Sequence, residues 1–308
     1  MTAVTRIQAQ PVPAWSFAVL WVAALALLWR DASTLVALAI RDDRYTQVIF
    51  APAIAAFLLF WDRDFIFAPR RRPSWVALLC LCISLVACVA LAVTSGRNSE
   101  EKLWLPGAVL FVTWVSSFAW ANGLDRALAA RFPLAMLLFM IPLPISLLDQ
   151  AVYALQRSST ELTEVLFQFS GMPFFRNGFQ FSLPGIEIEV AKECSGIRST
   201  VALLIIGLLA SHMFLRTAAA KLSLVLLVIP IAIFKNAVRI VTLSTLAVYV
   251  DRGWLEGSLH HRGGGAFALI GALLLVPLFL GLRKLERHRV PSKDSVGPIS
   301  NTPAALTG

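Results

Sequence analysis

Eight apolar stretches dominate this chain of 308 residues and limit the folds that are open to it. They cover residues 14–30, 47–61, 74–95, 104–122, 132–150, 198–215, 222–249 and 264–282. A helix needs about 20 apolar residues to cross a bilayer, and in lipid every backbone N–H and C=O must be satisfied within its own segment. The sequence therefore predicts an all-α membrane protein, a polytopic bundle of about eight transmembrane helices.

The composition agrees with this class, because 58% of the residues are hydrophobic and only 15% are charged, whereas soluble proteins average about 25% charged residues. The net charge of +9 would also fit a nucleic-acid-binding protein. The basic residues, however, are spread over short loops and the C-terminal tail and leave no compact basic surface for phosphates. We therefore expect the chain to contact a lipid bilayer and no nucleic acid.

The Lys and Arg residues of the short loops predict how the helices are oriented. They mark the second, fourth and sixth loops as cytoplasmic: Arg63, Arg70, Arg71, Arg72, Arg126, Arg131, Arg216 and Lys221. Counting spans alternately then places both termini inside and four segments outside: 31–46, 96–103, 151–197 and 250–263. We expect a multi-pass domain of the cytoplasmic (inner) membrane over residues 1–290 and a disordered cytoplasmic tail over residues 291–308.

The long outer segment, residues 151–197, has a predicted structure of its own. Its first part carries apolar residues at mostly helical spacing with polar residues between them, which predicts an amphipathic helix at the membrane interface. After residue 173 the apolar residues alternate, and Asn177-Gly178 and Pro184-Gly185 are typical turn pairs. We expect a small extracytoplasmic helix and a β-meander that leads the chain to Cys194.

Cysteines are few. Cys80, Cys82 and Cys88 lie inside one apolar run, where we expect them to be small buried hydrophobic residues. Cys194 is different, because polar residues surround it and the sixth predicted span follows directly. No spacing among the four suggests a disulfide framework.

Polar residues gather at three places where the membrane should exclude them. These are Cys194 with Arg198 before the sixth span, Lys235, Asn236 and Arg239 inside the seventh, and His260 and His261 before the eighth. An arginine at the centre of a transmembrane helix costs at least about 2.5–3.5 kcal/mol. Arg239 lies roughly 27 Å along the helix from Lys221, near the outer boundary of a core about 30 Å thick. The loop charges thus place all three groups at the same outer depth.

Cys194, Arg239 and His260 are the residue types of a nucleophilic site. A thiolate is favoured by nearby positive charge, an arginine suits the oxyanion that forms when a thiolate attacks a carbonyl, and a histidine transfers the proton. The alternatives are a structural thiol, an Arg239 side chain that reaches the outer headgroups, and a metal site. Adjacent histidines offer poor geometry for a metal and Arg239 would repel it, so we expect neither metal nor cofactor.

Three motifs resemble those of the exosortase family. They are "AKECSGIRS" at 191–199, "NAVRI" at 236–240 and "LHHRGG" at 259–264, in the order in which that family has them. The resemblance covers about residues 14–285, the extent of the hydrophobic framework. At the second span the likeness is incomplete, because Thr46 and Gln47 stand where the family has Ser-His.

The resemblance implies a set of site residues. Cys194 would be the nucleophile, Arg239 its electrostatic partner and His260 the acid and base. His261 is an alternative to His260. Arg198 and Asn236 are candidates for supporting roles.

The resemblance also implies a function, a membrane-embedded cysteine peptidase or transpeptidase. Its partners would be exported proteins with a C-terminal, PEP-CTERM-like sorting tail, cleaved through a thioester at Cys194. Two alternatives come from other classes: a membrane transporter in which Arg239 binds an anion, and an assembly protein of a polysaccharide export system. Neither needs the Cys194 thiol.

Overall fold

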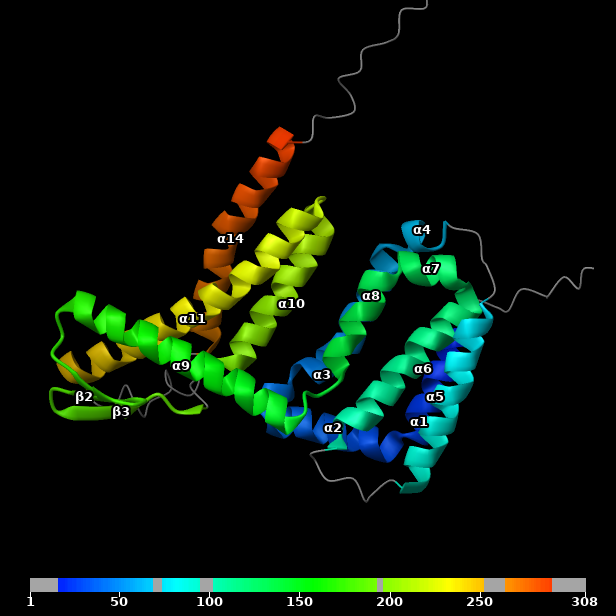
Figure 1. Ribbon diagram of the computed structural model, residues 1–308, viewed down its shortest axis with the longest axis horizontal. Coiled ribbons are helices and arrows are strands. Elements are labelled where there is room, and N and C mark those ends of the chain that lie inside the picture. The colour runs from blue at the N-terminus through cyan, green and yellow to red at the C-terminus, as the bar shows by residue number, and fades with distance from the viewer. Residues whose placement is uncertain (1–15, 69–73, 95–101, 193–195, 252–263, 290–308) are drawn as a thin grey trace, which may run out of the picture. The chain divides into compact units, whose positions relative to one another are not determined.

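The computed structural model describes residues 16–68, 74–94, 102–192, 196–251 and 264–289. The chain is mostly helical and divides into two compact units, Met1–Tyr153 and Ala154–Gly308 (Figure 1). Three predicted site residues, Cys194, His260 and His261, lie outside the described residues.

The first unit consists of helices. They are α1 (Ser16–Leu27), α2 (Trp29–Arg41), η1 (Asp43–Tyr45), α3 (Gln47–Trp61), α4 (Arg63–Ile66), α5 (Trp75–Thr94), α6 (Trp104–Asn122), α7 (Leu124–Ala129), α8 (Arg131–Met136), η3 (Leu137–Met140) and the start of α9 (Ile145–Ser170). α6 packs against both α1 and α5. Trp21 of α1 stacks on Trp114 of α6 with ring centroids 4.8 Å apart, and its indole N–H donates to the Trp114 carbonyl over 3.0 Å.

The outer segment that we predicted as a loop at 31–46 is largely helical. α2 extends to Arg41, and it bends from α1 by 81°. Ala32, Leu35 and Ala39 are buried on one face of α2, at spacings that bring residues together on a helix. The prediction was wrong because it took the polar residues of this segment as a loop and overlooked the helical spacing of the apolar residues among them.

The predicted span 132–150 is also interrupted. Residues Arg131–Met140 and α9 meet at a bend of 94°. Pro142 and Pro144 lie in the break, where their missing N–H groups and fixed backbone angles oppose a continuous helix. The amphipathic helix of the outer segment therefore begins at Ile145 instead of near residue 151.

Four helices in the described parts of the chain are long and apolar enough to cross a membrane, or up to six if each bent pair is one span. The four are Trp75–Val93, Trp104–Asn122, Ile197–Phe214 and Ala218–Tyr249. α3 has the predicted bounds 47–61, but its 15 residues are fewer than the about 20 that a span needs. The described residues thus give four to six candidate spans, and the predicted number of eight is not confirmed.

Two cysteines of α5 are not where we expected them. Cys88 is buried, with its Sγ 3.6 Å from Thr113 Oγ1 on α6, whereas Cys80 and Cys82 are exposed. An apolar helix at the edge of a membrane bundle has a face that packs on other helices and a face left for lipid. The run of apolar residues did not distinguish these two faces.

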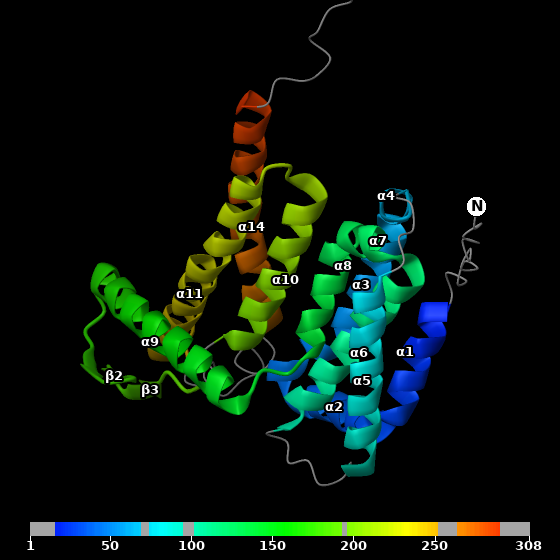
Figure 2. The same cartoon turned by 45° about the vertical axis from the view of Figure 1, so that its right-hand side comes forward.

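Three helices form the centre of the second unit: α10 (Ile197–Phe214), α11 (Ala218–Tyr249) and α14 (Gly264–Arg289). They lie side by side in both views (Figure 2). Their shared core includes Leu203, Leu224, Val228 and Leu275. Gly271 allows close approach, because a Cβ there would lie 2.8 Å from Leu203 Cδ1, and small residues at such contacts are typical of membrane helices.

A carboxylate fixes the turn between α10 and α11. Glu286 of α14 accepts hydrogen bonds from the backbone N–H groups of Arg216 (3.1 Å) and Thr217 (2.7 Å) and from the Thr217 hydroxyl (2.5 Å). Thr217 is the N-cap of α11, so the carboxylate also lies at the positive end of that helix. Burial acts to raise the pKa of Glu286, but these donors outweigh it and hold the pKa below its usual value.

Three short strands follow α9: β1 (Phe175–Asn177), β2 (Gln180–Leu183) and β3 (Ile186–Glu189). They form an antiparallel sheet in the order β1-β2-β3, with Phe181 opposite both Arg176 and Ile188. Phe181 packs in a core with Phe167 of α9, and Ile240 and Val241 of α11 lie against that core. The sheet is thereby attached to the part of α11 that follows Arg239.

One polar contact joins α9 to the chain directly after the sheet. Its buried residues include Gln156, Ser159, Thr160 and Thr163. The Gln156 amide donates to the Val190 carbonyl over 2.6 Å, directly after β3. This bond fixes the chain at Val190, four residues before Cys194.

Candidate functional site

α10 begins at a glycine that no other residue would replace easily. Gly196, the N-cap of α10, has φ +74°, in the left-handed region that favours glycine. A Cβ at this position would lie 3.1 Å from Asn236 Oδ1 and 3.3 Å from Asn236 Cγ. The backbone two residues after Cys194 therefore lies directly against α11.

The Gly196 carbonyl is held by three donors. Ser199 Oγ, Thr200 Oγ1 and the Thr200 N–H each donate to it over 2.9 Å. The first turn of α10 thus fixes its own N-cap, and Arg198 lies on the exposed side of that turn.

α11 presents a second polar contact to α10. Lys235 is 2% exposed, and its ammonium group donates a hydrogen bond to Ser199 Oγ. Asn236, the next residue, is 1% exposed and lies against Gly196. Arg239 follows Lys235 by four residues, so the two cations share one side of the helix.

Arg239 faces the start of α14. Its guanidinium carbon lies 6.0 Å from the centre of the Phe267 ring, a cation–π distance. Phe267 is buried and follows His260 by seven residues in the chain. Gly196 and Phe267 therefore lie against α11 within one helical turn, at Asn236 and Arg239.

Sequence reasoning had assigned no role to Lys235 or Ser199. Lys235 was visible as a charge in an apolar run, one turn before Arg239, and Ser199 ends the cysteine motif. Their hydrogen bond joins residues 36 positions apart, and neither residue type identifies its partner. The signal for Lys235 was its predicted depth in the membrane, where a charge is expected to have a partner.

Within the described ranges, no group of three or more His, Cys, Asp or Glu side chains could hold a metal ion. Lys235 and Arg239 lie on the helix that contacts Gly196, and their positive charges would repel a cation. The described residues of the site thus suit negative charge.

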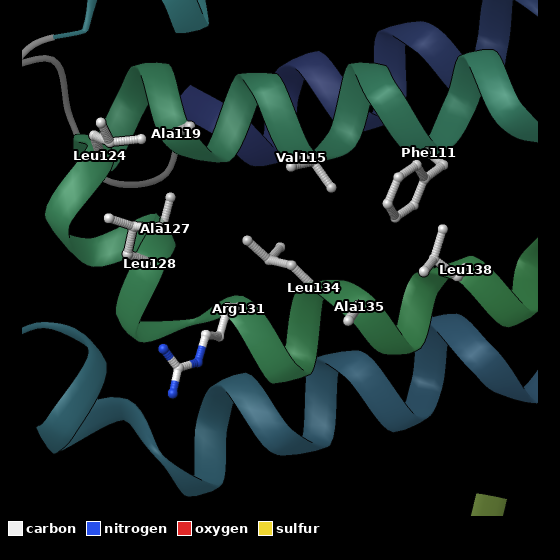
Figure 3. A pocket seen from close by; sticks show the side chains of 10 residues that line it. All are labelled: Phe111, Val115, Ala119, Leu124, Ala127, Leu128, Arg131, Leu134, Ala135 and Leu138. Atoms are coloured by element: carbon white, nitrogen blue, oxygen red, sulfur yellow. The ribbon is translucent and has the colours of Figure 1, made fainter. Parts of the chain in front are cut away.

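A separate groove of about 330 Å³ lies in the first unit, between α6, α7 and α8 (Figure 3). Phe111 and Val115 of α6 face Leu134 and Leu138 across it, and Arg131 lies at one end. The lining side chains are otherwise apolar and include no nucleophile or proton-transferring group. This groove offers no group for the expected chemistry.

A family model described as Transmembrane exosortase (Exosortase_EpsH) matches residues 39–277 of the chain. The match begins in α2 and ends in α14, and it includes every predicted site residue. No curated protein and no solved structure gave a match.

Proposed function

The chain belongs to the transmembrane exosortase family, and we propose that it cleaves C-terminal sorting tails from exported proteins as a membrane-embedded cysteine peptidase or transpeptidase. The family acts on exported proteins in a membrane and is associated with peptidase and sorting functions.

In the proposed reaction the Cys194 thiolate attacks the carbonyl carbon of the peptide bond just outside the substrate's membrane helix. Arg239 stabilises the oxyanion that forms. When the C–N bond breaks, His260 gives a proton to the leaving amine, and a thioester joins Cys194 to the exported protein. Water or an acceptor amine then attacks the thioester, His260 takes the proton of the attacking group, and the Cys194 thiolate leaves. His261 is the alternative proton carrier.

The convergence of Gly196, Arg239 and Phe267 is the observation that carries this proposal. Gly196 is two residues after Cys194, and Phe267 is seven residues after His260. Contacts with Asn236 and Arg239 bring both of these neighbours to one stretch of α11. A nucleophile, an oxyanion partner and a proton carrier can act together only if they lie close to one another. The contacts of Gly196 and Phe267 with α11 are consistent with such an arrangement.

The charges at the other end of α11 support an outward-facing site. Arg216 and Lys221 lie where α11 begins, and Arg283 and Lys284 lie in the last part of α14. Basic residues concentrate on the cytoplasmic side of membrane helices. Arg239 is 22 residues along α11 from its N-cap Thr217, which at 1.5 Å per residue is roughly 33 Å. We therefore propose that the site faces outward and the termini lie in the cytoplasm.

A thiol substitution tests the proposal. The probe is an exported reporter that ends in a PEP-type motif, one apolar helix and a basic terminus, produced together with the protein. Cys194→Ala should leave the reporter tail intact on an immunoblot, while the protein accumulates normally. Cys82→Ala is the matched control, because Cys82 is an exposed cysteine of α5, and it should process the reporter fully. Complete processing by Cys194→Ala would exclude the cysteine mechanism, and a transporter or assembly protein should tolerate that change.

The partners of the thiol are tested in the same assay. Arg239→Lys keeps the charge but loses the planar donor fork, and loss of one oxyanion donor typically lowers kcat by about 10²–10³. Arg283→Lys, on α14, should remain active. His260→Ala should be much more damaging than His261→Ala, and equal tolerance of both would remove histidine from the mechanism.

A further inference from the structure

Lys235 is a buried cation that the proposed mechanism does not use. It is 2% exposed. A Cβ on Gly271 of α14 would lie 3.2 Å from Lys235 Cδ, so the lysine stem is covered closely by that helix. Removing an ammonium group from water costs several kcal/mol unless partners compensate. A lysine at this depth therefore needs a reason other than packing.

Ser199, the partner of Lys235, is also hydrogen-bonded to the backbone near Cys194. Lys235 Nζ donates to Ser199 Oγ, and Ser199 Oγ donates to the Gly196 carbonyl over 2.9 Å. An ammonium group has donors only, so it occupies a lone pair of the hydroxyl and leaves the hydroxyl proton for the carbonyl. Charged donors strengthen such bonds, and bonds in a chain polarise one another.

The neighbours of Ser199 favour one of two roles for the pair. In a serine–lysine nucleophile pair, a neutral lysine would accept the serine proton. Here Ser199 Oγ also lies 2.9 Å from the Gly196 carbonyl, an acceptor that competes with Lys235 for the hydroxyl proton. The same carbonyl also holds Thr200, and Gly196 lies against Asn236. The geometry is that of a support for the start of α10.

We propose that Lys235 is a positioning residue for the reaction proposed above, acting through Ser199 on the Gly196 carbonyl. The lysine and serine join the backbone that follows Cys194 to the turn of α11 that precedes Arg239. Losing either side chain lets the Gly196 peptide turn away from α11, and the attack of the thiolate becomes slower while substrate binding is kept. The inference rests on the proposed function, because the positioned group is the Cys194 nucleophile.

Two pairs of variants test this role. Ser199→Ala removes the link and Ser199→Thr keeps a hydroxyl. Ser211→Ala is the matched control, because Ser211 lies on the same helix, is buried, and donates its hydroxyl to the carbonyl three residues earlier, that of Leu208, over 2.8 Å. Lys235→Met keeps a long apolar side chain without the charge. All are measured on the full chain in proteoliposomes with the tailed reporter at several densities.

We expect Ser199→Ala and Lys235→Met each to lower kcat for tail removal by about 10- to 100-fold, the size of a small misplacement of reacting groups, with KM within about twofold of the wild type. The kcat of the double variant should be no lower than that of the less active single variant, because both residues act in one chain of bonds. Ser199→Thr should recover most of the rate, and Ser211→Ala should match the wild type.

A second readout does not depend on cleavage. In a background with Cys80, Cys82 and Cys88 replaced by alanine, Cys194 is alkylated with N-ethylmaleimide. Ser199→Ala and Lys235→Met should each slow alkylation several-fold relative to Ser211→Ala, since nearby positive charge would then stabilise the Cys194 thiolate less. An unchanged kcat and alkylation rate in Ser199→Ala, with Cys194→Ala inactive, would overturn this inference alone. Activity that survives Cys194→Ala but not Ser199→Ala or Ser199→Thr would overturn the proposed function as well, and would indicate a serine–lysine enzyme.

Discussion

Arg239 of α11 and Phe267 of α14 meet with the guanidinium carbon 6.0 Å from the ring centre. The arginine is partly buried and the phenylalanine is buried. A contact between a cation and an aromatic face is worth about 0.5–1 kcal/mol when exposed and about 2 kcal/mol when both groups are shielded from water. The contact therefore restricts the guanidinium of the residue that we assign to the oxyanion, and it does so from the helix that follows His260 and His261.

Replacing the ring should weaken catalysis without removing a catalytic group. Phe267→Leu keeps an apolar side chain but loses the aromatic face, and we expect tail removal to slow by about 2- to 30-fold, the equivalent of about 0.5–2 kcal/mol. Phe279→Leu is the matched control, because Phe279 lies on the same helix and its ring packs edge-on against Phe214. Reporter processing is measured over time for both variants. Equal rates in the two variants would contradict a role for the Arg239–Phe267 contact.

Gly196→Ala should disturb the site in two ways, through backbone strain and through a close contact with Asn236. Gly171→Ala is a control that has only the first of these effects. The backbone angle φ +74° disfavours any side chain, and the new Cβ would lie 3.1 Å from Asn236 Oδ1. Gly171 has a similar φ of +69°, but a Cβ there would meet nothing within 4 Å. Gly171→Ala therefore carries only the backbone cost, about 1–2 kcal/mol.

We expect Gly196→Ala to lose most of its tail-removal activity and Gly171→Ala to keep it, with both proteins present in the membrane. Thermal unfolding in detergent measures the shared backbone cost, and reporter cleavage measures the effect on the site. Full activity of Gly196→Ala would mean that the contact of Gly196 with Asn236 does not position Cys194.

The sequence predicted the long helices well where an apolar run was uninterrupted. The predicted span 104–122 coincides with α6, and the predicted 222–249 ends with α11 at Tyr249. The family inferred from the three motifs is also confirmed. Length and hydropathy are local properties, so they can be read without knowing what a segment touches.

The errors have a common physical cause, which is that tertiary contacts are not local. The buried face of α2 depends on packing as well as on apolar content. The pair Lys235–Ser199 joins residues 36 positions apart, and Thr217–Glu286 joins residues 69 positions apart. The type of a residue shows that it needs a partner when it is buried, but only the fold shows which residue that partner is.

Glu286 should make stability depend on acid. Its folded pKa lies below its usual value, so the carboxylate stabilises the turn between α10 and α11 above the usual pKa, and this contribution is lost as pH falls through the folded value. At pH 7, Glu286→Gln should lower the free energy of unfolding by about 1–3 kcal/mol, and the variant should therefore unfold at a lower temperature. The difference between wild type and Glu286→Gln should shrink as the pH falls below about 4.5. Glu161→Gln is the control, because Glu161 is exposed, and a pH-independent difference for Glu286→Gln would contradict this role.

The orientation in the membrane is testable apart from the chemistry. In a background with all four cysteines replaced, Asn177→Cys reports on the turn after β1 and Ala219→Cys on the first turn of α11, both at exposed positions. The loop charges place Asn177 outside and Ala219 in the cytoplasm. An impermeant maleimide should therefore label Asn177→Cys in cells whose outer barrier is open and inner membrane intact, and should label Ala219→Cys only after the inner membrane is permeabilised. The reverse pattern would place Arg239 and the start of α10 on the cytoplasmic side, where no exported protein could reach them, and would exclude the proposed site.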